Sequence, residues 1–147
     1  MRRLLVVLPL LVACGDQLPC SSCPMIAGPY LVSWQLGFPQ DGCPAEGPRP
    51  VNFNLTQSGN QLSVLIGGEE LRGTLYDTFD FSVSGGRSDT TYALRGRAVT
   101  SGATTTPDGG TTQGNVRLVG SLSSNSSNSN AGANNCDLTE RYTADRL

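Results

Sequence analysis

Strict alternation of apolar and polar residues, in short runs between turn residues, most constrains the fold of this 147-residue chain. From Val51 to Gln57 the sequence reads V-N-F-N-L-T-Q, which places successive side chains on opposite faces of one strand. No segment after residue 27 has the period of an amphipathic helix. The pattern therefore predicts an all-β domain.

The same reading predicts eight short strands, of about six residues each, joined mostly by tight turns. They cover residues 30–36, 51–57, 62–66, 71–75, 79–84, 92–98, 116–122 and 138–144. Turn residues separate them at 58–60, 67–68, 77–78 and 85–86. The side chains predicted to face inward are Phe53, Leu55, Leu62, Val64, Ile66, Leu71, Phe79, Phe81, Val83, Tyr92, Leu94 and Leu118.

Eight consecutive antiparallel strands with one apolar face favour an up-and-down barrel, because closure removes the exposed edges of an open sheet. A two-sheet β-sandwich is the alternative. The interior of an eight-stranded barrel is just wide enough for side chains to fill. Because the inward residues are bulky, we favour a packed core over an apolar cavity.

The N-terminus combines Arg2 and Arg3, an apolar run from Leu4 to Val12, and the ending Leu11-Val12-Ala13-Cys14. This pattern resembles the lipobox of bacterial lipoproteins. The resemblance implies a signal peptide over 1–13, lipid on Cys14, a lipidated tether over 14–27 and a barrel domain over 28–147. An ordinary export signal with an incidental Cys14, or a cytosolic protein with an apolar first strand, are the alternatives.

The lipobox resemblance also implies a cell-envelope location with a membrane contact through the lipid. Gly15, rather than an aspartate, follows Cys14, which by the same resemblance favours the outer membrane over the inner membrane. Removal of Arg2 and Arg3 with the signal changes the net charge from −2 to −4. An acidic chain of this kind argues against nucleic acid as a partner.

Composition excludes much catalytic chemistry. The chain has no histidine, and all ten basic residues are arginines. A Ser-His-Asp triad, imidazole zinc ligands and a Schiff-base lysine are therefore absent. The remaining acid–base candidates are the pairs Glu69 and Glu70, Asp77 and Asp80, and Asp137 and Glu140, each expected to be solvated near a turn or strand end. We predict no enzyme activity, no metal and no cofactor.

Lipidation of Cys14 would leave four cysteines, which usually form disulfides outside the inner membrane. If the last strand closes the barrel against the first, Cys43 and Cys136 both lie near that seam, and we predict that they are bonded. Cys20 and Cys23 then remain as a second pair. Because the tether is expected to lie outside the core, this second bridge is expected to be dispensable.

Several short motifs support a resemblance over about residues 28–146 to the small lipocalin-like (calycin) β-barrels. They are Gly28-Pro29-Tyr30, the hairpin from Thr56 to Leu62, the strand from Leu71 to Leu75, and Cys136 before Tyr142–Arg146. Lipocalins pack a late arginine across a first-strand tryptophan. The resemblance thus implies that Arg146 lies over Tyr30 or Trp34, with these aromatics in the core or against a ligand.

The predicted topology places residues 37–50, 67–69, 85–90 and 123–136 at one mouth, facing away from the tether. Residues 100–114 and 123–135 are rich in Ser, Thr, Asn and Gly and are predicted to be flexible loops. The preferred function is a lipid-anchored binding or structural module whose partner is an unidentified protein or glycan. The alternative is a carrier of a small hydrophobic ligand, and an enzyme or enzyme inhibitor is third.

Overall fold

The fold is described from a computed structural model of the chain. The structure describes residues 17–35, 48–87, 89–102, 104–105, 111–112, 114–126 and 136–147. The strands in this part are β1 (Gly28–Gln35), β2 (Asn52–Ser58), β3 (Gln61–Ile66), β4 (Glu69–Leu75), β5 (Asp80–Gly86), β6 (Thr90–Ser101), β7 (Thr104–Thr105), β8 (Thr111–Thr112), β9 (Asn115–Ser126) and β10 (Cys136–Arg146).

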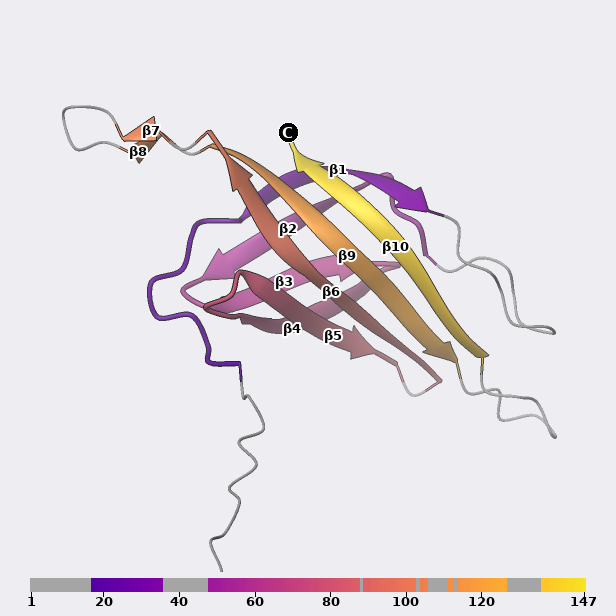
Figure 1. The fold of residues 1–147 in the computed structure, drawn as a ribbon. Helices are drawn as coiled ribbons and strands as arrows, with labels where there is room; N and C mark the ends of the chain where they lie inside the picture. Colours follow the sequence, from indigo (N-terminus) through magenta and orange to yellow (C-terminus); the bar gives the residue numbers. More distant parts are fainter. Residues whose placement is uncertain are drawn as a thin grey trace, which may run out of the picture.

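Eight of these strands close into an antiparallel barrel, in the order β1-β10-β9-β6-β5-β4-β3-β2 (Figure 1). Barrel strands that are consecutive in the sequence are therefore neighbours in space. The barrel closes where the last strand, β10, pairs with the first, β1. This confirms the predicted up-and-down barrel and excludes the sandwich. β7 and β8 form a separate two-stranded ladder inside the segment predicted to be a loop.

Three strands are longer than the sequence pattern indicated. β6 and β9 have 12 residues each and β10 has 11. β9 continues through Ser123 to Ser126, where it pairs with both β6 and β10. The prediction that the polar segment is a loop from Ser123 onward was therefore wrong for its first four residues, because two neighbouring strands satisfy their backbone groups.

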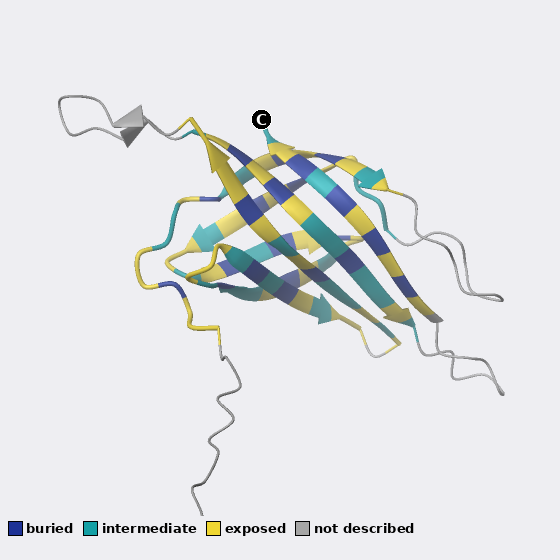
Figure 2. Cartoon of the chain, viewed as in Figure 1, coloured by how far each residue is buried: buried dark blue, intermediate teal, exposed yellow. Residues whose placement is uncertain are grey.

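The barrel interior holds one continuous cluster of buried apolar side chains. Along much of the barrel strands buried residues alternate with exposed or half-buried ones, which appears as dark blue bands between yellow and teal ones in Figure 2. Ten of the predicted inward residues are buried, and Tyr92 is partly buried against the same cluster. These side chains support the prediction of a packed core over a cavity.

Phe79 is the exception to the inward set, because it is 42% exposed. The prediction assumed a two-residue turn at Asp77-Thr78 and continued the alternation of β5 back to position 79. Instead the loop has three residues, and Phe79 closes it in the left-handed region with a φ of 63°. Its N–H donates to the Tyr76 carbonyl oxygen at 2.9 Å.

The predicted glycine turn between β3 and β4 is confirmed. Gly67 and Gly68 have φ values of 61° and 84°. Positive φ at both positions is typical of a type I′ hairpin, whose twist matches that of the flanking strands. The register of Ile66 opposite Glu69 across this turn keeps Ile66 on the interior face.

Gly96 and Gly120 lie opposite each other on β6 and β9 and make room for a bulky ring. A Cβ atom on Gly96 would lie only 2.8 Å from the Tyr142 hydroxyl and 3.0 Å from the Phe81 ring. A Cβ atom on Gly120 would meet the Arg95 carbonyl oxygen at 1.9 Å. Gly96 therefore leaves room for the Tyr142 side chain, and Gly120 allows β9 to lie close to the β6 backbone.

The barrel has two mouths. The N-terminal mouth carries residues 17–27, the turns at 59–60 and 76–79, and the C-terminus, whereas the distal mouth carries the opposite ends of the strands. Figure 1 shows the indigo segment before β1 running along the N-terminal mouth. This division agrees with the predicted distribution of the connections.

Residues 17–27 are packed onto the N-terminal mouth. Pro19 forms a β-bridge with Tyr76, and the Cys20 N–H donates to the Leu75 carbonyl oxygen at 3.0 Å. Ile26 is fully buried, and its N–H donates to Gln57 Oε1 at 2.8 Å. The expectation that this segment lies outside the core was therefore wrong, because Cys20 and Ile26 belong to it.

Candidate functional site

A buried ion pair lies toward the distal mouth. Glu140 on β10 shares the interior face with Leu138 and Tyr142, and its side chain is only 2% exposed. Arg49, just before β2, donates from Nε to Glu140 Oε1 at 2.7 Å, and the Arg49 side chain is 24% exposed. A carboxylate in an apolar interior requires such a partner, because desolvation of an unpaired charge is costly.

An indole ring lies near this pair. Trp34 at the end of β1 is partly buried, and its Nε1 donates to the Pro50 carbonyl oxygen at 3.0 Å. Its ring packs on Tyr142 with a centroid distance of 5.6 Å and an interplanar angle of 52°. We call Trp34, Arg49, Pro50 and Glu140 the distal cluster.

The distal cluster was only partly anticipated from the sequence. Trp34 was a candidate ligand or core aromatic, whereas Arg49 was not considered and Glu140 was expected to be solvated. The expectation for Glu140 was wrong. Its position in phase with Leu138, Tyr142 and Ala144 along β10 was the sequence feature that could have identified an inward side chain.

Tyr30 and Arg146 lie at the other mouth, directly opposite each other in the β1–β10 ladder. Tyr30 is fully buried, and its hydroxyl donates to the Ile26 carbonyl oxygen at 2.6 Å. Arg146 donates to the carbonyl oxygens of Met25, at 3.4 Å, and Gly114, at 3.1 Å. Burial raises the pKa of Tyr30 to about 12, although the nearby Arg146 charge lowers it.

The structure thus places Arg146 beside Tyr30, not beside Trp34. In the same ladder Trp34 lies opposite Tyr142. The three residues that the lipocalin-like resemblance singled out are therefore divided between the two mouths. Tyr30 packs in the core, and Arg146 holds the N-terminal segment by donating to the Met25 carbonyl oxygen.

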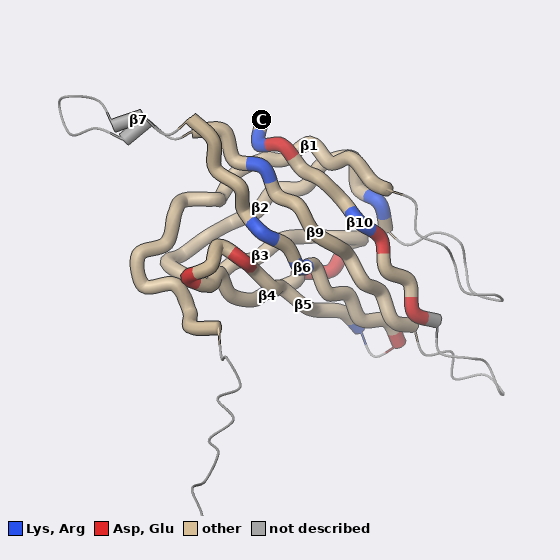
Figure 3. Tube along the Cα trace, in the orientation of Figure 1, with Lys and Arg blue, Asp and Glu red and all other residues tan. Residues whose placement is uncertain are grey.

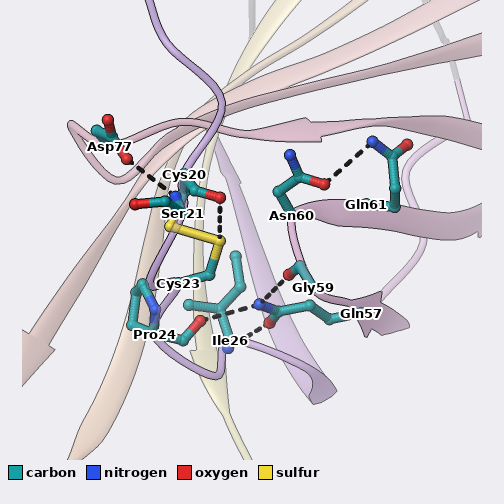
Figure 4. The surroundings of a disulfide bond; sticks show 10 residues. All are labelled: Cys20, Ser21, Cys23, Pro24, Ile26, Gln57, Gly59, Asn60, Gln61 and Asp77. Carbon is teal, nitrogen blue, oxygen red and sulfur yellow. Dashed lines mark hydrogen bonds between the residues drawn. A yellow bond between two sulfur atoms is a disulfide. The ribbon is translucent and has the colours of Figure 1, made fainter.

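The Cys20–Cys23 disulfide is present at the N-terminal mouth, with Cα atoms 5.3 Å apart (Figure 4). Cys20 is buried, and Cys23 packs against the core cluster. Cys14 and Cys43 lie outside the described residues. Cys136 begins β10 opposite Ser126, but its side chain is not among those described. The Cys43–Cys136 bridge and the lipid on Cys14 remain predictions.

Most of the remaining carboxylates considered for acid–base chemistry are bound to arginines. Asp80 accepts from Arg97 at 2.7 and 3.0 Å, and Glu70 accepts from Arg72 at 2.7 Å. These hydrogen bonds lower the pKa values of both Asp80 and Glu70. Glu69 is paired with Arg87.

The last two carboxylates bind neutral groups. Asp77 accepts from the Ser21 N–H at 3.3 Å, and Asp137 accepts from the Asn125 side chain. Within the described part of the chain, no cluster of cysteine and carboxylate side chains is suited to hold a metal ion.

An open groove lies along β5, β6, β9 and β10 toward the distal end. Short side chains predominate along it, including the cross-strand row of Ser84, Ala93, Ser123 and Thr139. Ser123 and Thr139 hydroxyls lie 3.1 Å apart. The groove is open to solvent, unlike the barrel interior, and its lining is more apolar than polar.

No protein family, curated protein or solved structure gave a significant match to this chain. The closed barrel is shown by its own strand pairing. No helix among the described residues has the length and apolar character needed to cross a bilayer. Function is therefore argued from the chain's own residues.

Proposed function

We propose that this protein is a cell-envelope lipoprotein, anchored through Cys14, whose barrel is a binding or structural module that presents its distal mouth to a partner. The lipid anchor rests on the Leu11–Cys14 ending after a short apolar run. Gly15 favours the outer membrane as the site of anchoring. The proposed partner is an unidentified protein or glycan.

One observation supports this orientation of the barrel relative to the membrane. The chain becomes part of the barrel at Gln17, whose side chain donates to Asp80 at 3.4 Å, and Pro19 already pairs with Tyr76. Three residue steps separate Cys14 from Gln17, a span of at most about 10 Å. A lipid on Cys14 therefore holds the N-terminal mouth close to the membrane and directs the distal mouth away from it.

The distal cluster supports binding at that far mouth. A partly buried ion pair such as Arg49–Glu140 is rarely the most stabilising choice for an interior site, since apolar residues of similar volume often serve as well. Trp34 beside it contributes an amphipathic ring of the kind enriched at interfaces. We therefore assign partner recognition to this mouth.

The carrier alternative is less well supported. Side chains such as Phe53, Leu94, Leu118 and Tyr142 are buried together in the interior that a carried ligand would occupy. An enzyme function has no supporting arrangement among the described carboxylates, because their partners are arginines or neutral donors. We therefore keep the module as the proposal.

Two measurements test this proposal. Metabolic labelling with palmitate should mark the native chain and leave the Cys14→Ser variant unlabelled and released from the membrane fraction. An unlabelled native chain would refute the anchor. Native mass spectrometry of the purified, delipidated protein should show the protein mass alone, whereas a co-purifying small molecule would favour the carrier.

A further inference from the structure

The N-terminal mouth bears four of the nine exposed large apolar side chains of the described residues. Leu18 is 67% exposed, Met25 51%, Phe79 42% and Leu147 73%. All four belong to segments at this mouth, namely residues 17–27, the β4–β5 turn and the C-terminus. We call them the apolar rim. Exposed apolar groups collected in one region mark a contact surface.

Hydrogen bonds to backbone carbonyl oxygens hold the rim residues in two pairs, Leu18 with Phe79 and Met25 with Leu147. Asp77 N–H donates to the Leu18 carbonyl oxygen at 3.1 Å, which keeps Leu18 beside the turn that ends at Phe79. Arg146 reaches the Met25 carbonyl oxygen, and the Leu147 N–H donates to the Pro29 carbonyl oxygen at 2.9 Å. The rim residues are therefore held on ordered backbone.

Phe79 adopts a backbone conformation that is unfavourable for a residue with a side chain. The final residue of a three-residue hairpin loop adopts positive φ, and glycine is the usual choice because it has no Cβ atom. Phe79 occupies this position with a φ of 63°. An exposed aromatic ring at a position suited to glycine indicates that the ring itself has a use.

Charged side chains of both signs lie near the rim: two acidic residues are paired with arginines, whereas Asp77 and Arg146 bind neutral backbone groups. Asp80 is paired with Arg97, and Asp145 accepts from Arg117 at 2.6 and 3.1 Å. Figure 3 shows acidic and basic positions close together along this end of β6, β9 and β10. Contact here would thus depend on apolar groups more than on attraction to charged lipid.

We infer that the apolar rim rests on the lipid surface in which Cys14 is anchored, and that it fixes the barrel upright on the membrane. This inference rests on the proposed function, because the short span from Cys14 to Gln17 is what brings the rim to the bilayer. Rings and aliphatic side chains enter the boundary between headgroups and acyl chains. The occupant of this surface is therefore the bilayer and not a second protein.

The test uses the full chain, purified from membranes and reconstituted into phosphatidylcholine vesicles that contain brominated acyl chains. The chain has one tryptophan, Trp34, so the probes are made in a Trp34→Phe background. Phe79→Trp reports on the rim. Leu65→Trp is the matched control, because Leu65 is 63% exposed on β3 near the distal mouth.

We expect brominated lipid to reduce the Phe79→Trp emission roughly twofold, since the ring lies at the acyl boundary, and to leave the Leu65→Trp emission unchanged. Raised salt should not alter this difference. Equal emission from the two probes would overturn the inference. Shielding of the position-79 probe from aqueous iodide without quenching by lipid would also overturn it, by assigning the rim to a second copy of the chain.

The intact mass of the same sample reports separately on the lipid at Cys14. A lipidated chain with an unquenched probe at position 79 would reject the membrane contact alone. A chain without lipid would reject the proposed anchor and the inference that depends on it. The two failures are therefore distinguishable in one preparation.

Discussion

The Tyr30 hydroxyl donates a 2.6 Å hydrogen bond to the carbonyl oxygen of Ile26, and both residues are fully buried. This contact fastens the N-terminal segment to the first strand of the barrel. Tyr30→Phe should lower the free energy of unfolding by about 1.5 kcal/mol, because the buried carbonyl loses its donor. Urea unfolding measures the loss. Tyr92→Phe is the control and should change stability much less.

The buried tyrosines also predict a loss of stability at alkaline pH. The pKa of Tyr30 is about 12 in the folded chain against the ordinary value of 10.0. Below pH 10 both states keep the proton, whereas between pH 10 and 12 the unfolded chain releases it first, so stability falls as pH rises. Burial raises the pKa of Tyr142 as well.

Unfolding curves measured across this alkaline window check the prediction. Tyr30→Phe should make the decline in stability with pH shallower than in the native chain. A decline of equal slope in both proteins would show that Tyr30 ionises normally in the folded state.

The Arg49–Glu140 pair should be costly to break from one side. Arg49→Met leaves the Glu140 carboxylate buried without this arginine and should reduce stability by about 3 kcal/mol. Arg49→Met combined with Glu140→Leu should recover most of that loss. Arg117→Met is the matched control, because its pair with Asp145 is more than half exposed and should scarcely change stability.

Position 79 offers a test of the turn geometry. Phe79→Gly should be more stable than Phe79→Ala by about 1 kcal/mol, because both variants remove the ring and only alanine retains a Cβ atom in the left-handed region. Thermal unfolding of the two proteins gives the comparison. A more stable alanine variant would contradict the φ of 63° found at this residue.

Non-reducing peptide mapping should find Cys43 bonded to Cys136. A bridge across so long a segment restricts the unfolded chain strongly, and its removal by Cys43→Ser with Cys136→Ser should cost roughly 4 kcal/mol. Cys20→Ser with Cys23→Ser should cost roughly 2 kcal/mol, not the negligible amount expected for a free tether, because Cys20 is buried. Mixed pairing between the two sets would refute the seam argument.

The sequence predicted the barrel because local period and turn chemistry agree along most of the chain. The alternation around Phe53 and Leu55 and the double glycine at Gly67-Gly68 each determine structure within a few residues. Closure of the last strand on the first followed from the number of strands and the need to pair their edges. Such features can be read without knowledge of tertiary contacts.

The errors arose where tertiary contacts decide. Ile26 is buried where its N–H donates to Gln57, 31 residues further along the chain, and its carbonyl oxygen accepts from the buried Tyr30 hydroxyl. Glu140 can be buried because Arg49, 91 residues away in the sequence, pairs with its carboxylate. Phe79 left the predicted phase because it is the third residue of the loop, where its positive φ interrupts the alternation before β5 begins at Asp80. The local pattern of apolar and polar residues does not indicate these tertiary contacts.

The length of β9 determines the distance between the N-terminal mouth and the distal mouth, where a partner is proposed to bind. Twelve extended residues span about 40 Å, and the usual tilt of barrel strands reduces the height to about 30 Å. If the proposed anchor lies only three residue steps before Gln17, the distal mouth has a short reach from the membrane. Under that proposal a partner has to come to within one membrane thickness of the surface, which favours ligands that are themselves held at the envelope.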